Sequence, residues 1–199
     1  MFSGIVEWVA KILHRDGGHF TVQNIFQEPL VLGQSIAHDG ACMTITDIQD
    51  GAYSFFVMEE SLSKTQLWLK KNGDLLNVER SLQFGQRVDG HMVTGHIDIT
   101  GQVVSFDVRS DGSWDLIILL SPHYRDYILP KGSIAINGVS LTVVDTYPTE
   151  QWNTLVKVCL IPYTFASTNL WWIQPWDSVN IECDMMAKYI VTTVKNIQS

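Results

Sequence analysis

The chain has 199 residues, of which 46% are hydrophobic and 17% charged, and its 21 acidic and 13 basic side chains give a formal net charge of −8. This charge balance excludes a strongly basic nucleic-acid-binding surface, and the hydrophobic content is too high for a disordered chain. The length allows one larger domain or two domains of about a hundred residues each.

The amino-terminal segment, residues 1–7, has neither a basic leader nor a small-residue cleavage site, so we expect mature sequence in the cytosol. The longest aliphatic run, residues 116–120, is far shorter than the roughly 20 apolar residues of a membrane helix. We therefore expect no membrane association.

Three cysteines, at positions 42, 159 and 183, are odd in number and widely spaced, which predicts no disulfide framework. His91 and His96 are five residues apart and would lie on opposite faces of a strand, so their geometry disfavours a metal site. The glycine-rich signatures of phosphate and dinucleotide binding are missing from the sequence. The common nucleotide-dependent enzymes are therefore disfavoured.

The chain contains an internal repeat. Residues 35–47 align with residues 133–145 at an offset of 98, and six of the thirteen positions are identical. Residues 3–7 align with 94–98 at an offset of 91, and residues 65–67 and 77–79 align with 168–170 and 180–182 at an offset of 103. The growing offset places a five-residue insertion between Asp145 and Ile161, where residues 147–151 are predicted as a loop. Two copies of one domain are the simplest interpretation.

Short β-branched and aromatic runs bounded by Gly or Asp predict strands in both copies. In chain order these runs are residues 35–47, 53–58 and 75–80, then 103–108, 116–120, 133–145, 155–161 and 178–183. Residues 61–70 and 122–129 are predicted to form short helices between strands. So many short strands in each copy of about ninety residues predict a small closed barrel.

A terminal amphipathic helix is predicted after the second copy. Its apolar positions have helical spacing and face away from Lys188, Thr192 and Lys195; they are Met186, Ile190, Val191, Val194 and Ile197. The helix could dock on its own chain or mediate self-association, and we favour self-association.

A duplicated domain offers two similar pockets related by an approximate twofold axis, which suits a reaction between two copies of one molecule. The copies differ at aligned positions: Cys42 matches Ser140, and Ile5 matches His96. These differences predict unequal roles for the two pockets. The alternative is drift, because a cysteine often acts as a small buried hydrophobic residue and a histidine as a packing residue.

These residues together resemble the riboflavin synthases of the trimeric α-chain type. The resemblance rests on residues 1–7, on Ser-Ile-Ala-His-Asp-Gly-Ala-Cys-Met-Thr at 35–44, and on Gly-His-Met-Val-Thr-Gly-His at 90–96. It continues through residues 131–142, 161–164 and 179–182, in order and with the family's spacing.

The resemblance implies an all-β fold of two tandem six-stranded antiparallel Greek-key barrels plus a C-terminal α-helix. The expected barrels span residues 1–88 and 89–184, and the helix, residues 185–199, would hold a cytoplasmic homotrimer together. The implied reaction converts two molecules of 6,7-dimethyl-8-ribityllumazine into riboflavin and 5-amino-6-ribitylamino-uracil by moving a four-carbon unit. No metal, organic cofactor or nucleic acid is implied, and an association with lumazine synthase is expected.

The resemblance also implies site residues, with Cys42, His96 and Ser140 as the catalytic candidates. One substrate molecule would contact Gly4, Ile5, Val6, Cys42, Met43, Thr44, Phe56, Val57, Met58, Glu59, Glu60 and Ser61. The other would contact Gly95, His96, Ile97, Lys131, Ser140, Leu141, Thr142, Ile161, Pro162, Tyr163, Thr164, Phe165 and Ala166. In the family, the reacting pair is expected between the N-terminal barrel of one chain and the C-terminal barrel of its neighbour.

The implied chemistry needs positioning and modest base assistance, because the carbanion of the lumazine 7-methyl group delocalises into the ring. A nucleophile then adds at ring carbon 7 of the partner molecule, and Cys42, Ser140 or an activated water could serve. His96 is a candidate proton carrier because the ordinary pKa of histidine is near neutrality. The Thr44 and Thr142 strands could bind ribityl hydroxyl groups.

Two features depart from the family pattern. Trp171, Trp172 and Trp176 stand where a turn containing Gly and Lys is expected, and Asn137 stands where an aspartate is often found. Two other functions remain open, a non-catalytic lumazine carrier and a two-barrel module for another ligand. Carriers tend to lose the Cys-Met-Thr and Gly-His residues, and this chain keeps both, which favours the enzyme.

Overall fold

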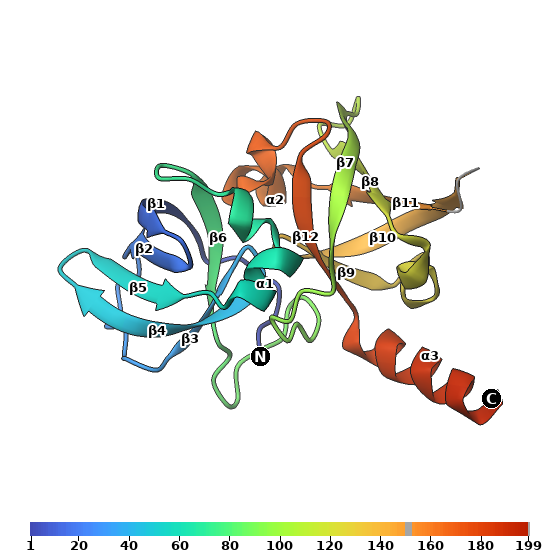
Figure 1. Cartoon of the computed structure of the whole chain (residues 1–199). Helices are drawn as coiled ribbons and strands as arrows, with labels where there is room; N and C mark the ends of the chain where they lie inside the picture. Colours follow the sequence, from blue (N-terminus) through green and yellow to red (C-terminus); the bar gives the residue numbers. More distant parts are fainter. Residues whose placement is uncertain (150–152, 199) are drawn as a thin grey trace.

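The computed structural model describes residues 1–149 and 153–198. Two closed six-stranded antiparallel barrels lie side by side, and a C-terminal helix projects from the second barrel (Figure 1). The expected all-β architecture of two tandem barrels is confirmed.

The first barrel has the strand order β1-β2-β5-β4-β3-β6. Its elements are β1 (Trp8–Asp16), β2 (His19–Gln23), β3 (Ser35–His38), β4 (Ala41–Gln49), β5 (Ala52–Phe56), α1 (Glu59–Lys64), the 3₁₀ helix η1 (Gln66–Leu69) and β6 (Leu75–Arg80). Inward-facing side chains such as Ile12, Phe20 and Phe55 fill the barrel and alternate with outward-facing ones.

The second barrel has the order β10-β11-β8-β7-β12-β9, the same arrangement in its own elements. These are β7 (Ile99–Val108), β8 (Trp114–Leu120), η2 (Pro122–Tyr127), β9 (Ser133–Ile136), β10 (Val139–Pro148), β11 (Thr154–Leu160), α2 (Pro162–Ser167), η3 (Asn169–Trp172) and β12 (Ser178–Cys183), followed by α3 (Met185–Gln198). Leu116, Ile118 and Leu120 of β8 face inward and are buried, and each such side chain contributes about 1.5–3 kcal/mol by its burial.

β-Bulges fall at matched places in the two barrels. The register shifts between Ile12 and His14 in β1 and between Val103 and Ser105 in β7, which are aligned positions at an offset of 91. A second matched pair, at an offset of 98, lies in β4 and β10. Because bulges bend strands and increase their twist, they help to close each small barrel, and their repetition supports the duplication.

The two barrels meet at a pair of equivalent hairpin turns. Asp39-Gly40 and Asn137-Gly138 have positive φ at both residues, 44° and 82° in the first turn and 47° and 77° in the second. A Cβ atom on either glycine would lie 2.7 Å from the backbone nitrogen of the other. Only glycine allows this approach of two backbones.

A buried polar network surrounds these turns and joins the barrels. Asn77 Nδ2 donates to the Asn137 carbonyl and Asn180 Nδ2 to the Asp39 carbonyl, both at 2.9 Å. The Asp39 carboxylate accepts hydrogen bonds from Asn77 N, Asn169 Nδ2 and Gln66 Nε2, and it forms an ion pair of 2.9 Å with Lys70. Among the described residues of this network, Asp39 and Lys70 are the only pair of opposite charges, and both belong to the first copy.

Several predicted elements need correction. Residues 35–47 and 133–145 were each predicted as one strand, but each forms a hairpin that turns at Asp39 or Asn137. The prediction missed β1, β2, α2 and η3. The predicted loop at 147–151 is wrong at Tyr147 and Pro148, which pair with Leu155 and Thr154 in β10 and β11, and residues 150 and 151 lie outside the described residues.

The predicted terminal helix is confirmed as α3. Two ion pairs tie it to its own chain, Lys188 with Asp98 at 2.9 Å and Lys195 with Asp126 at 2.7 Å. No described residue of α3 is buried. None of the described helices is both long enough and apolar enough to cross a membrane.

Candidate active site

Each barrel's candidate site is completed by a segment of the other copy. Cys42 N on β4 donates a 2.8 Å hydrogen bond to the carbonyl of Gly95, which belongs to the second copy. Ser140 N on β10 donates a 2.7 Å hydrogen bond to the carbonyl of Gly4, which belongs to the first copy. The two segments that precede β1 and β7 are therefore exchanged between the barrels.

Gly4 and Gly95 make this exchange possible. A Cβ atom on Gly4 would lie 2.6 Å from the Ser140 Cβ, and one on Gly95 would lie 2.5 Å from the Cys42 Cβ. Both glycines also have positive φ, 75° and 85°. A larger residue would push the segment away from the candidate nucleophile.

Two buried carboxylates fix the exchanged segments. Glu79 accepts hydrogen bonds from Ser3 N and Ser3 Oγ on one oxygen and from Gly4 N on the other. Glu182 holds Thr94 and Gly95 in the same way. Burial raises the pKa of Glu79, while the donors from Ser3 and Gly4 oppose that shift. These glutamates position the backbone on which each site depends.

A pocket of about 230 Å³ opens beside Cys42. Its wall combines β4, α1 and the exchanged segment; the lining residues are Ala41, Cys42, Met43, Glu60, Ser61, Lys64, Thr65, Gly95, His96 and Ile97. His96 is exposed, and Glu60 and Lys64 form an ion pair of 2.6 Å at the edge. The structure thus brings a thiol and an imidazole together at one pocket.

The Ser140 side has a different partner. His91 Nδ1 lies 2.7 Å from Ser140 Oγ, and His91 Nε2 is buried without a hydrogen-bond partner among the described residues. Burial lowers the pKa of His91, and the charge of Asp184 only partly opposes this shift. The imidazole is therefore held neutral at pH 7, a form that can accept a proton from a hydroxyl group or a substrate.

The remaining predicted contact residues divide by exposure. Ile5, Thr44, Phe56, Met58, Glu59, Lys131, Thr142, Ile161, Pro162, Tyr163 and Ala166 are exposed, and Val6, Ser61, Ile97 and Thr164 are partly buried. Met43, Val57 and Leu141 are buried in the barrel cores, so their side chains support the walls more than they offer a surface. Phe165 stacks on Trp114 with ring centroids 3.8 Å apart, which is a packing contact.

The structure changes the expected grouping of these residues. Gly4, Ile5 and Val6 were grouped with Cys42, but Gly4 lies against Ser140. Gly95, His96 and Ile97 were grouped with Ser140, but they line the Cys42 pocket. The repeat aligns each segment with its own copy and contains no information about which barrel it packs on, so the structure differs from the expected grouping in where these segments lie.

Sequence reasoning also missed three residues of the site. Glu79 and Glu182 were visible only as the ends of the Asn-Val-Glu and Asn-Ile-Glu repeats, and that match was the signal of a shared role. His91 has no counterpart in the aligned part of the first copy, so comparison of the copies could not find it.

The site residues are suited to acid–base and nucleophilic chemistry. Ser140 with neutral His91 can move a proton, and Cys42 with His96 offers a second nucleophile beside a second titratable group. Across residues 1–149 and 153–198, no group of three or more His, Cys, Asp or Glu side chains could hold a metal ion.

Comparison with known proteins agrees with this description. A family model described as the lumazine binding domain matches twice, at residues 3–81 and 94–184. The chain is 38% identical to the riboflavin synthase of Actinobacillus pleuropneumoniae, covering 96% of this chain and 88% of that protein. It is 34% identical to the riboflavin synthase of Escherichia coli strain K12, covering 99% and 93%.

Among solved structures, LumP complexed with 6,7-dimethyl-8-(1'-D-ribityl) lumazine has a TM-score of 0.76 to this chain at 19% identity. That match covers 92% of this chain and 99% of LumP. At this level of identity the likeness extends to the fold alone.

Proposed function

The chain belongs to the riboflavin synthase family, and we propose that it converts two molecules of 6,7-dimethyl-8-ribityllumazine into riboflavin and 5-amino-6-ribitylamino-uracil. The observation that carries this proposal is the pair of equivalent but unequal sites, Cys42 with His96 and Ser140 with His91. Two identical substrate molecules must play different parts in this reaction. Two related sites with different reactive groups meet that requirement.

On this proposal, the Ser140–His91 pair assists loss of the proton from the 7-methyl group of one lumazine. The hydroxyl, 2.7 Å from the imidazole, relays the proton to neutral His91, whose lowered pKa means that it returns the proton readily. The carbanion is delocalised into the ring, so a moderate base is sufficient.

Cys42 or a water molecule adds to ring carbon 7 of the other lumazine, and His96 supplies or accepts the accompanying proton. Gly95 keeps the second-copy segment against Cys42, so His96 reaches the first barrel's pocket. Most of the acceleration comes from holding the two substrates in a reactive orientation. We propose that the predicted contact residues bind substrate, with residues 4–6 at the Ser140 site and residues 95–97 at the Cys42 site. The buried Met43, Val57 and Leu141 and the stacked Phe165 support the walls of these sites.

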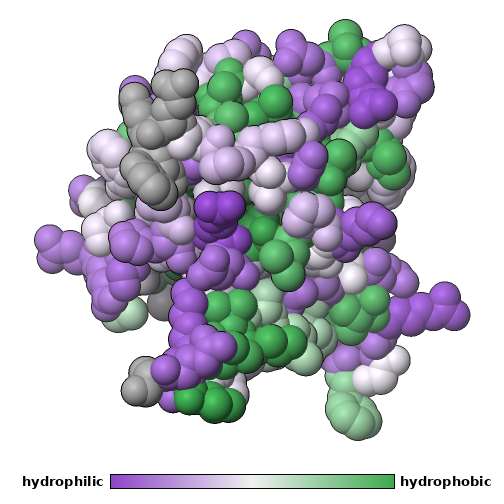
Figure 2. Space-filling model, turned by 90° about the vertical axis from the view of Figure 1, so that its right-hand side faces the viewer, coloured by the Kyte–Doolittle hydropathy of each residue, from purple (hydrophilic) through white to green (hydrophobic). Residues whose placement is uncertain are grey.

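For the assembly, we propose that residues 1–88 and 89–184 are the two lumazine-binding units and that 185–199 close a homotrimer. Support comes from α3, where Met186, Tyr189, Ile190, Val194 and Ile197 are exposed. Figure 2 shows hydrophobic side chains gathered on the lower part of the face that carries this helix. An exposed apolar surface of this kind is typical of an association site. The substrates would then react between the N-terminal barrel of one chain and the C-terminal barrel of its neighbour.

We also propose a cytoplasmic location, which the three free cysteines support, and an association with lumazine synthase, the supplier implied by the substrate.

The test is an assay of the purified full-length chain with 6,7-dimethyl-8-ribityllumazine. We expect riboflavin to form, and we expect Ser140→Ala and His91→Ala each to slow turnover by at least tenfold, because general acid–base assistance contributes about 10²–10⁴-fold. Lumazine that binds tightly and is not consumed would instead identify a carrier. Lumazine that does not bind would identify a module for another ligand.

A further inference from the structure

A second cavity, of about 520 Å³, lies between the two barrels and shares no lining residue with the Cys42 pocket. Matched segments of the two copies form its walls, from Gln66 to Leu75 on one side and from Asn169 to Ser178 on the other. It therefore lies on the approximate twofold axis. Its volume is in the range of sites that bind drug-sized molecules.

The two walls of this inter-barrel pocket differ in chemistry. The first copy contributes Leu69 and Lys70, and the aligned positions of the second copy hold Trp172 and Ile173. The Trp172 side chain is 66% exposed, so its ring is available at the mouth of the pocket. One wall is thus polar and the other presents an aromatic surface for stacking.

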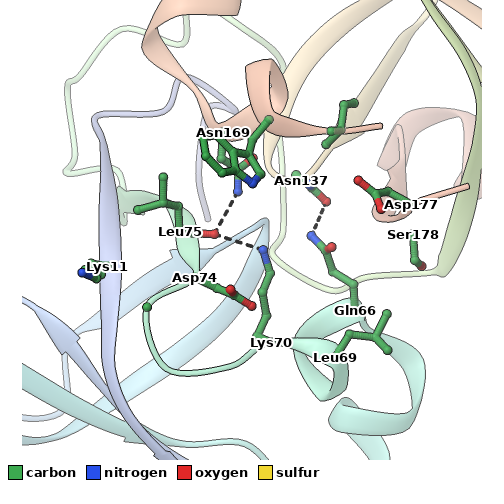
Figure 3. A pocket seen from close by; sticks show the side chains of 13 residues that line it. Lys11, Gln66, Leu69, Lys70, Asp74, Leu75, Asn137, Asn169, Asp177 and Ser178 are labelled. Atoms are coloured by element: carbon green, nitrogen blue, oxygen red, sulfur yellow. Dashed lines mark hydrogen bonds between the residues drawn. The ribbon is translucent and has the colours of Figure 1, made fainter. Parts of the chain in front are cut away.

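The wall of the pocket holds a buried hydrogen-bond acceptor without a partner among the described residues. Asn169 is only 5% exposed, its Nδ2 donates to Asp39 and to the Leu75 carbonyl, and its Oδ1 has no partner among the described residues. The Lys70 ammonium donates to the same Leu75 carbonyl (Figure 3). It also forms the ion pair with Asp39. A buried acceptor without a partner is costly unless a ligand or water donates to it.

The charges around the pocket nearly cancel. Two lysines, Lys11 and Lys70, and two aspartates, Asp74 and Asp177, line it. Lys70 is already paired with Asp39, and the buried acceptor Asn169 Oδ1 has no partner among the described residues. These features favour a neutral ligand that donates hydrogen bonds.

The backbone is strained beside the pocket. Trp176, which precedes the lining residue Asp177, has φ of 78°, and the aligned residue of the first copy is Gly73. A bulky residue in this region of φ is a rare and strained conformation, and Trp176 is 75% exposed, so burial does not compensate for the strain. The second copy keeps a tryptophan directly before a lining residue against its backbone preference.

We infer that the inter-barrel pocket binds a neutral planar heterocycle with N–H and hydroxyl donors, stacked on Trp172 and donating to Asn169 Oδ1. Riboflavin has these properties, and its choice as the ligand rests on the proposed function. The pocket would then be a product-binding site separate from the reacting centres.

Isothermal titration of the full-length chain with riboflavin tests this inference. We expect Trp172→Leu, which installs an aliphatic side chain like Leu69 at the aligned position, to remove one binding site per chain or weaken it about tenfold, the size expected for a lost stacking contact. Trp172→Phe keeps a ring and should retain the site. Trp68→Leu removes an exposed tryptophan that does not line the pocket and is the matched control.

All three variants should form riboflavin from lumazine at the wild-type rate, because neither Trp172 nor Trp68 lies in the candidate active site. Equal stoichiometry and affinity in the wild type and Trp172→Leu would overturn the inference. A failure of the proposed function would appear separately, as absence of riboflavin formation in the wild type, and leaves the titration readable.

Discussion

Replacement of Lys70 by methionine should destabilise the protein strongly, because it leaves the Asp39 carboxylate buried without a counter-charge. The Asp39 side chain is 0% exposed and that of Lys70 15% exposed, with 2.9 Å between Nζ and Oδ2. Removing one partner of a buried ion pair typically costs about 3–5 kcal/mol. Asp39 keeps three other donors, from Asn77, Asn169 and Gln66, so we expect the lower end, about 3 kcal/mol.

The measurement is thermal unfolding at a fixed protein concentration. For a chain of this length, about 3 kcal/mol corresponds to a fall in Tm of roughly 6–12 °C. Lys64→Met is the matched control, since it breaks the exposed Glu60–Lys64 pair of the same chemistry and should change Tm little. Adding Asp39→Asn to Lys70→Met removes the unpaired charge and should recover part of the loss. A Tm for Lys70→Met no lower than that of Lys64→Met would refute the reasoning.

Four further predictions concern catalysis, pH, assembly and strain. Cys42→Ala and Ser140→Ala should reduce turnover unequally in steady-state kinetics. His96→Ile should lower turnover at least tenfold, and it should lower turnover more than it changes the substrate affinity measured by ligand titration. Wild-type turnover in His96→Ile would remove that residue from the mechanism. Burial lowers the pKa of His38 from 6.5 to about 3, so the folded state binds fewer protons than the unfolded state and stability falls as pH drops below about 6.5. Between pH 7 and pH 4.5, the free energy of unfolding should fall by about 2–3 kcal/mol more in the wild type than in His38→Ile, as measured by denaturation at both pH values. Equal losses in the two proteins would contradict this prediction. Removal of residues 185–199 should give smaller particles in light scattering and lower activity, whereas particles that still contain the same number of chains would defeat the trimer proposal. Trp176→Gly should raise the free energy of unfolding by about 1 kcal/mol in a urea titration, because glycine adopts a positive φ without strain. A loss of stability would show that the tryptophan ring makes more packing contacts than its exposure indicates.

The internal repeat predicted much of the fold. Its matched residues include those that the hairpin turns and the inter-barrel hydrogen-bond network require. Asp39-Gly40 and Asn137-Gly138 are fixed by turn geometry and by mutual contact, so the copies stay alike there. β1 was missed because Trp8 and Leu13 are apolar but exposed, and because the bulge between Ile12 and His14 interrupts the alternation of buried and exposed positions.

The candidate site could be predicted only in part. Cys42 and Ser140 were found by comparing the copies, but the exchange of Gly4 and Gly95 between barrels depends on tertiary packing that no local pattern encodes. The Asn137 departure is explained by the network: the charged partner of the turn stands in the first copy as Asp39 with Lys70, and the aligned residues of the second copy are Asn137 and Ile173.

The most direct test of the central claim is the stoichiometry of product formation with the purified chain and 6,7-dimethyl-8-ribityllumazine. We predict that two lumazine molecules are consumed for each riboflavin and each 5-amino-6-ribitylamino-uracil formed, and that His91→Ala slows this turnover at least tenfold. Lumazine that is bound but not consumed, or a His91→Ala variant with wild-type turnover, would contradict the account of two unequal, exchanged sites.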